Sequence, residues 1–562
     1  CESWHASFEP GQQGTSCVMD GVPESAGPSW YDRRMKRLSW GRIEWTEAVP
    51  LAAVVTFHAT TQSYFLLHAS RFIGGFSAYS ADSADRLLIA ISWSRHPTFF
   101  IKPSAWLPTF FWIYGTLLRI WPNPAWASSV LTTVLSSLSL LPMYGICRKI
   151  GGEREGSLLV TAAAGFMPLT LWISAQPFFD PLFILIVLCG IYAWLSCDGG
   201  TRRGWHAAAI AAMAAAALTR YEGWLFVVAW LALTRQRPGL RLRLLVLVPI
   251  ALCLLHQLSA YGGLDFLRLQ RDPWLISAPS PDWRVISKVW ECVFMDGLLL
   301  PFILFSFPTL DLSQASVRET LGLVWLPFLA FSGMAQFLGF PLPREHLAPF
   351  LALQMIPLAP LASRALEAWG SSLRTWSPAW DRPARLALTL LLTSGAAIGW
   401  MMQPLPKVVG MAPVKLLRQI GTRLKPGERL LLELPIKGGH WPGSERFEDP
   451  QIMRLAAFPA EMKFDRPFRY RHYHDGSVAT FMLDTTTPSV LELPTDELDR
   501  ELKRLLVRMI IARSERKNLE RLGWRPAGLL FNHLFYTRSG DDLYPIVRTL
   551  IKEAQRQPVG QR

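Results

Sequence analysis

The chain has 562 residues, half of which are hydrophobic, and it carries a formal net charge of +14. A soluble protein of this length usually has more charged residues and fewer long apolar stretches, so the composition predicts a membrane protein. The excess of basic residues does not indicate nucleic-acid binding, because many of them stand in short segments between apolar stretches, where the positive-inside rule places them.

The N-terminal 34 residues are polar, begin without Met and lack the apolar core of a signal peptide. Met35, followed by two basic residues, is typical of a start before a first membrane span. We therefore expect residues 1–34 to be a disordered extension or a product of upstream translation, with a lipidated Cys1 as the less supported alternative. The seven cysteines show neither a CxxC motif nor metal-ligand spacing, which favours buried thiols over disulfides or a metal site.

Apolar stretches follow one another from residue 48, and several reach the roughly 17–23 residues that a membrane helix needs. They predict an all-α polytopic membrane domain over residues 35–402. The stretches are 48–68, 105–121, 125–147, 156–175, 179–197, 205–219, 223–235, 242–260, 293–308, 321–340, 347–366 and 385–402.

The stretch 105–121 decides the topology. If it does not cross the membrane, the basic clusters at 33–42, 148–154, 202–203, 235–243 and 364–385 all fall on the cytoplasmic side. If it crosses, every later basic loop changes sides. The charge rule therefore favours an interfacial helix on the outer side, which its three Trp residues also suit, and about eleven spans remain.

Residues 403–562 are polar and mixed in character, and the same topology places them outside the cytoplasm. Strand-like runs occur at 429–434, 529–531 and 534–537, and a charged stretch at 495–521 is predicted to be helical. We expect a small extracytoplasmic α/β domain here.

The loop after the first predicted span carries Asp82 and Asp85, followed by Arg86. Carboxylates beside a membrane helix are costly unless they serve a site, so both are candidate catalytic residues. As alternatives, the two carboxylates could be solvated or cap a helix, and Arg86 could only pair with Asp82 across one helical turn.

Further candidates for substrate binding lie on the same predicted side of the membrane. Each has a structural alternative: a turn before a proline, snorkelling to headgroups, an interfacial belt, a local ion pair or an interface anchor. Asp180 stands at another outer turn, where it could simply cap a helix. The candidates are His96, Lys102, Trp106, Arg220, Glu222, Arg344 and His346.

This set of residues suits the transfer of a group from a lipid-phosphate carrier. A carboxylate would take the proton of an acceptor hydroxyl. Basic side chains would hold the phosphate as its negative charge grows. One base and one leaving group imply direct displacement with inversion.

Several segments resemble the GT-C class of integral-membrane glycosyltransferases, close to the protein mannosyltransferases and aminoarabinose transferases (family 39-like). The resemblance covers roughly residues 36–402 and implies a polyprenyl-phosphate sugar donor, inverting transfer and an active site at the outer face. Alignment on Arg86 selects Asp82 as the catalytic residue, and alignment on Ala90 selects Asp85. The matching segments are Asp82-Ser83-Ala84-Asp85-Arg86, Lys102-Pro103 to Trp106-Leu107-Pro108, 144–152, 218–224 and Pro343-Arg344-Glu345-His346.

The resemblance leaves the sugar open, as well as the acceptor, which could be a lipid, a protein or a glycan. No spacing requires a metal, although a loop carboxylate could bind a divalent cation. We expect an integral protein of a bacterial plasma (inner) membrane, surrounded by membrane lipids. Two alternatives remain: a transporter or flippase of lipid-linked sugars, and a non-catalytic envelope assembly protein that binds partners through residues 403–562.

Overall fold

A computed structural model gives the fold in two units, Cys1–Pro50 and Leu51–Arg562. The extension predicted at 1–34 lies outside the described residues, as do Lys102 and Trp106. The structure describes residues 45–73, 81–100, 107–174, 178–197, 203–234, 239–261, 306–338, 344–374, 387, 391, 411–425, 427–433, 461–464, 468–470, 481–483, 489–512, 514–530 and 533–556.

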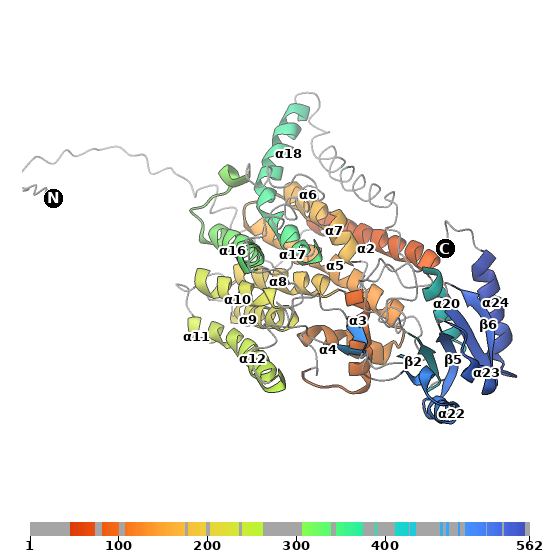
Figure 1. The fold of residues 1–562 in the computed structure, drawn as a ribbon. Coiled ribbons are helices and arrows are strands. Elements are labelled where there is room, and N and C mark those ends of the chain that lie inside the picture. Colours follow the sequence, from red (N-terminus) through yellow and green to blue (C-terminus); the bar gives the residue numbers. More distant parts are fainter. Residues whose placement is uncertain are drawn as a thin grey trace, which may run out of the picture. The chain divides into compact units, whose positions relative to one another are not determined.

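Up to residue 374, every described regular element is a helix, and these helices coincide with most of the predicted apolar stretches (Figure 1). The stretches 293–308 and 385–402 lie mostly outside the described residues. The helices are α2 (Trp45–Ile73), α3 (Ala81–Arg95), α4 (Thr109–Ile120), α5 (Pro124–Lys149), α6 (Arg154–Gly165), α7 (Pro168–Ser174), α8 (Asp180–Leu195), α9 (Arg203–Thr219), α10 (Glu222–Leu233), α11 (Leu240–Arg243), α12 (Leu247–Tyr261), α16 (Ala315–Leu338), α17 (Arg344–Gln354) and α18 (Ala359–Arg374), with 3-10 turns at Leu244–Val246, Phe307–Thr309 and Ile356–Leu358.

Two predicted spans are interrupted. The stretch 156–175 forms α6 and α7, because Pro168 has no N–H to continue the hydrogen bonds of α6. The stretch 347–366 is divided between α17 and α18 by a 3-10 turn at Ile356–Leu358. Among the described residues, two segments, Trp126–Lys149 and Pro349–Ser372, are long and apolar enough to cross a membrane. The count of eleven spans stays a prediction.

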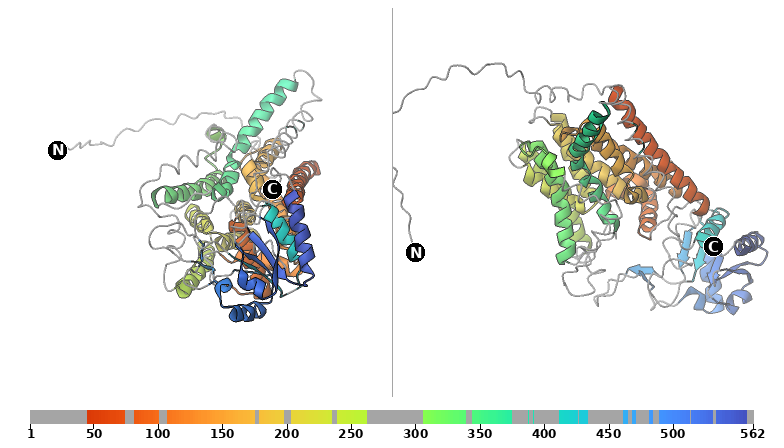
Figure 2. Two further views of the ribbon diagram at one scale, coloured as in Figure 1. Left: turned by 45° about the vertical axis from the view of Figure 1, so that its right-hand side comes forward. Right: turned by 90° about the horizontal axis from the view of Figure 1, so that it is seen from above.

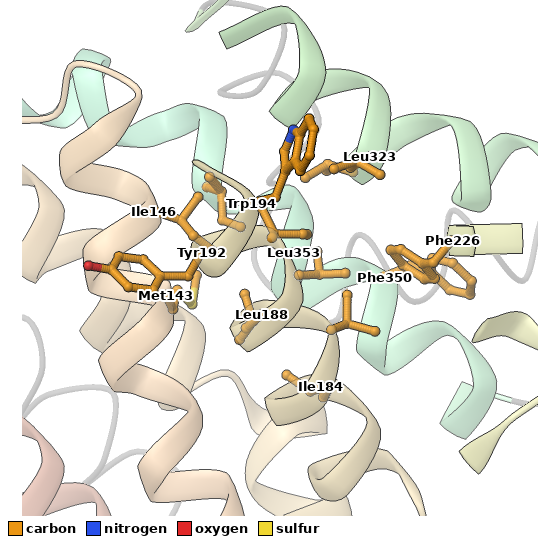
Figure 3. Close-up of a cluster of buried hydrophobic side chains, with 14 of the residues drawn as sticks. Met143, Ile146, Ile184, Leu188, Tyr192, Trp194, Phe226, Leu323, Phe350 and Leu353 are labelled. Atoms are coloured by element: carbon orange, nitrogen blue, oxygen red, sulfur yellow. The ribbon is translucent and has the colours of Figure 1, made fainter. Parts of the chain in front are cut away.

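Helix α8 lies at the centre of the helical core and contacts α5, α9, α10, α16 and α17. Its side chains are buried along nearly the whole helix, which explains why its sequence is apolar on every side. Figure 3 shows the core cluster around α8, to which α5, α10, α16 and α17 each contribute. The labelled members are Met143, Ile146, Ile184, Leu188, Tyr192, Trp194, Phe226, Leu323, Phe350 and Leu353.

The C-terminal part contains a five-stranded mixed sheet in the order β2-β1-β5-β7-β6 and a two-stranded ribbon of β3 and β4. Strand β1 pairs in parallel with β2 and β5, whereas β7 is antiparallel to both β5 and β6. The strands are β1 (Arg429–Leu432), β2 (Glu461–Phe464), β3 (Phe468–Tyr470), β4 (Phe481–Leu483), β5 (Val507–Ala512), β6 (Trp524–Leu530) and β7 (His533–Arg538).

Helices cover both faces of this sheet. Leu430 and Ile511 face α20 (Met411–Gly421) and α24 (Leu543–Arg556), which lie together in Figure 2. The next residues along the strands, Leu431 and Ile510, face α22 (Thr495–Arg504) and α23 (Lys517–Arg521) on the other side. The alternation follows from the two-residue period of a strand.

The prediction of one helical stretch over 495–521 is wrong, because the central strand β5 separates α22 from α23. Apart from Arg508, the segment Val507–Ala512 is apolar on both faces since the sheet is covered on both sides, and such a run has no strand-like alternation to reveal it. The strands predicted at 429–434, 529–531 and 534–537 are confirmed as β1, β6 and β7, although β6 begins earlier, at Trp524.

Candidate functional site

The acidic segment after the first predicted span is helix α3, and the expectation of a loop is wrong at this point. Residues Ala81–Arg95 contain neither Gly nor Pro, and several of them have high helix propensity. Asp82 and Asp85 stand three positions apart in its first turns, which places them on one face of the helix.

Arg86 joins the start of α3 to the segment that precedes α8. Its side chain is buried, and the guanidinium carbon lies 4.3 Å from the centre of the Phe179 ring and 5.3 Å from that of Phe178. A cation stacked on two aromatic faces is attracted by both. The turn that carries the two predicted catalytic residues is therefore held against the residues next to Asp180.

A buried ion cluster lies at the adjoining helix ends. Arg220 Nη1 is 2.5 Å from Asp180 Oδ1, and its Nη2 and Nε donate to the two oxygens of Glu222 at 2.6 and 3.1 Å. The side chains are only 1–9% exposed. Asp180 begins α8 and Glu222 begins α10, so both carboxylates lie where a helix dipole favours negative charge.

The turn between α9 and α10 brings Arg220 and Glu222 into this position. Gly223 leaves no room for a side chain, since a Cβ on this residue would lie 2.3 Å from the carbonyl oxygen of Ala216. The close approach of the two helices thus requires glycine at this residue. The pairing of Arg220 with Glu222 was one of the alternatives raised by the sequence, and Asp180 extends it to a third helix.

The cluster is recessed along the bundle. Lys149 Nζ donates to the carbonyl of Leu195, so α5 and α8 end at the same level. Helix α5 has 26 residues and α8 has 16. At a rise of about 1.5 Å per residue they extend roughly 39 and 24 Å, so Asp180 lies about 15 Å along the axis from the first residue of α5.

The structure thus brings three predicted segments together: the start of α3, the start of α8 and the α9–α10 turn. Arg344 and His346 stand in the first turn of α17, a helix that packs against α7 and α8. His96 follows the last residue of α3 and is exposed, about 21 Å by helical rise from Asp82 along the backbone. The described residues therefore do not bring His96 to the cluster.

Asp180 is the site residue that sequence reasoning undervalued as a helix cap. The signal that could have found it is an acidic residue at the start of an otherwise apolar segment. Within the described residues, no group of three or more His, Cys, Asp or Glu side chains is arranged to hold a metal ion. What the cluster can supply chemically is a fixed, dehydrated set of charges beside the acidic turn of α3.

No protein-family model and no curated protein matches the chain. Among solved structures, ArnT from Cupriavidus metallidurans bound to undecaprenyl phosphate has a TM-score of 0.55 and 12% identity, over 87% of this chain and 98% of that one. The oligosaccharyltransferase of Archaeoglobus fulgidus, in complex with zinc and sulfate, has a TM-score of 0.45 and 11% identity, over 82% of this chain and 67% of that one.

Proposed function

From the premise that this chain has the fold of the GT-C glycosyltransferases, as its sequence segments predicted, we propose that it is an inverting glycosyltransferase. It moves a sugar from a polyprenyl-phosphate donor to an acceptor at the outer face of the membrane. The observation that carries the proposal is the meeting of the acidic turn of α3 with the recessed Asp180–Arg220–Glu222 cluster. ArnT, the relative with the same fold, binds a polyprenyl phosphate.

In the proposed reaction, Asp82 or Asp85 takes the proton from the acceptor hydroxyl. The acceptor oxygen attacks the anomeric carbon while the bond from this carbon to the phosphate oxygen breaks. The electron pair of that bond goes to the phosphate, which leaves as polyprenyl phosphate with one more negative charge. A single displacement inverts the configuration at the anomeric carbon.

We propose that Arg86 fixes the orientation of the α3 turn and that Asp180 and Glu222 orient Arg220. Basic groups from several segments would then stabilise the charge that develops on the phosphate. Besides Arg86 and Arg220, the proposed contacts from the outer segments are Lys102, Trp106, Arg344 and His346, whereas His96 at the far end of α3 is not among them.

The first test is turnover of lipid-linked sugars by the purified protein, with the product identified by mass spectrometry. Asp82→Asn or Asp85→Asn should lower kcat by about 100- to 10,000-fold, because the variant side chain cannot accept the proton. Asp496→Asn, at an exposed carboxylate of α22, is the matched control and should leave turnover unchanged. Full transfer by the Asp82→Asn/Asp85→Asn double variant would refute the assignment of the base.

Sealed vesicles separate a transferase from a flippase. Movement of the lipid-linked sugar across the vesicle membrane with no new covalent product would contradict the proposal. Cysteine substitution at positions 82 and 344 tests the orientation, since only reagents added on the outer side should reach these positions. Unchanged transfer after deletion of 403–562 would assign an accessory role to the C-terminal domain.

A further inference from the structure

A histidine in the first apolar helix makes two hydrogen bonds that the proposed reaction does not use. His58 on α2 is fully buried. Its Nε2 lies 3.1 Å from the carbonyl oxygen of Gly165, and its Nδ1 lies 2.9 Å from the hydroxyl of Ser137 on α5. The ring also packs edge-on against Phe166, with 5.4 Å between the ring centres.

The carbonyl determines which ring nitrogen carries the hydrogen. A carbonyl oxygen can only accept, so Nε2 of His58 must donate to Gly165. In the neutral ring, Nδ1 is then the acceptor and the Ser137 hydroxyl donates to it. An ionisable side chain buried in an apolar helix calls for a specific explanation, and this one has two well-placed partners on two other helices.

The partner carbonyl belongs to the point where the helix breaks. Gly165 ends α6, and α7 begins three residues later at Pro168, which has no N–H to offer to the preceding turn. A broken helix inside a membrane must have its free carbonyl groups satisfied from elsewhere. His58 satisfies one of them. A Cβ on Gly165 would lie 2.9 Å from Leu140 Cδ2 and 3.3 Å from His58 Cδ2, so a side chain here would displace Leu140.

The far end of α7 is held by the neighbouring serine of α5. Ser174 and Ser136 lie 2.6 Å apart, oxygen to oxygen. One end of the bend is thus joined to α5 through His58 and Ser137, and the other end directly through Ser136.

Helix α7 leads into the residues that carry the proposed site. Phe178 stands four residues after Ser174, and α7 contacts α8, which begins at Asp180. Phe178, Phe179 and Asp180 hold Arg86 and Arg220. We propose that His58 is a positioning residue, which locks the bend between α6 and α7 and thereby sets the location of the Phe178–Asp180 segment. This inference rests on the proposed transferase function for its kinetic consequence, but not for its structural one.

Two substitutions separate the bonds of His58. Gln can place a donating amide where Nε2 lies and so keep the bond to Gly165, whereas Asn reaches only as far as Nδ1 and keeps the contact with Ser137. His58→Asn and His58→Leu should lower kcat by about 10- to 100-fold with little change in the KM for the donor, because a small displacement of the site misaligns the reacting groups. His58→Gln should retain most of the wild-type kcat.

Thr132→Val is the matched control. Thr132 is equally buried on α5, but its hydroxyl donates only to carbonyls of its own helix, Ser128 and Ser129. This variant should have wild-type kcat and KM.

A cross-link measures the position of α7 without any activity. In a Ser136→Cys/Ser174→Cys protein the two sulfurs should be close enough to form a disulfide, detected as a linked peptide pair by mass spectrometry. Adding His58→Leu or His58→Asn should remove most of this product, whereas His58→Gln and Thr132→Val should not.

The outcomes distinguish the inference from the function it rests on. Wild-type cross-linking and wild-type kcat in His58→Leu would overturn the positioning role, and so would a His58→Gln protein as impaired as His58→Asn. If the wild-type protein transfers no sugar, the proposed function fails, and cross-linking alone then decides whether His58 fixes the bend.

Discussion

The molecule contains two clusters in which one arginine binds several carboxylates, and they lie in different surroundings. Arg220 bonds Asp180 and Glu222 inside the helical bundle, where its side chain is 6% exposed. Arg508, at the start of β5, bonds three carboxylates and is 29% exposed. The three partners of Arg508 are Glu428, Asp541 and Asp542, which line an open groove of about 800 Å³.

The difference in exposure decides what each cluster can do. Water can replace a lost partner around Arg508, since Asp542 is 84% exposed. Water cannot replace a lost partner around the buried Arg220, so each charge of this cluster is stabilised only by the others. The Arg220 cluster is costly to bury and joins three helix ends, so a functional site explains it better than stability alone. The Arg508 cluster is explained by ordinary ion pairs that connect the sheet to the neighbouring turns.

Substitution of Arg220 should have the largest effect. Arg220→Met removes the cation that Asp180 and Glu222 share, and it should destabilise the helical part by about 3–5 kcal/mol because two buried carboxylates lose their partner. Arg220→Lys keeps the positive charge but not the planar guanidinium, so it should lose less stability than Arg220→Met. The measurement is hydrogen exchange in peptides of α8 and α10, followed by mass spectrometry.

Arg318→Met provides the control for Arg220. Arg318 is exposed on α16 and donates to the carbonyls of Leu312 and Ser313. Its loss should change stability by no more than about 0.5 kcal/mol. Equal exchange in Arg220→Met and Arg318→Met would mean that the burial of Arg220 and its two carboxylates adds nothing to the stability of the helical part.

The contrast also shows what a sequence can predict. Arg220 and Glu222 are two residues apart, so their pairing could be foreseen, but Asp180 lies 40 residues earlier and joins them only through the packing of α8 against α9. The helices could be predicted from their apolar stretches, because side chains that are buried on every side of a helix are apolar. Pro168 in the sequence indicates the break, but the stretch 156–175 is apolar throughout and was therefore predicted as one helix.

Two further features depended on tertiary contacts. Strand β5 lies between two charged helices, and its apolar residues have no alternation because both faces of the sheet are covered. His58 is a single polar residue in an apolar stretch, and only its bonds to Ser137 and Gly165 show what it does. The first turn of α3 looked like a loop because its polar residues precede the apolar part of the helix.

The Arg508 cluster should show an intermediate effect that depends on pH. Burial raises the pKa of the Asp541 carboxyl, but hydrogen bonds from Arg508 and from the backbone N–H of Leu543 outweigh it and hold the pKa below its usual value. A lowered pKa in the folded state means that the stabilisation is fully present above the unfolded value of about 3.9 and is lost as the pH falls through the folded value.

Arg508→Met should therefore cost about 1–2 kcal/mol at neutral pH, discounted for exposure, and the difference from wild type should disappear as the pH falls through the lowered pKa of Asp541. Hydrogen exchange in peptides of β5 and β7 measures it in the whole protein. Arg500→Met, an exposed arginine on α22, should behave as wild type. An acid dependence that survives in Arg508→Met would show that another carboxylate carries it.

The smallest effect belongs to an exposed pair on α22. Lys503 Nζ lies 2.5 Å from Asp499 Oδ2 one helical turn away, and the lysine side chain is 61% exposed. Lys503→Ala should change stability by less than about 0.5 kcal/mol, because water solvates both charges and Asp499 still contacts Arg538 at 3.3 Å. Hydrogen exchange in α22 and β5 peptides at low and high salt checks this, since screening should erase even that small difference. A loss as large as that of Arg508→Met would show that exposure does not rank the ion pairs of this protein.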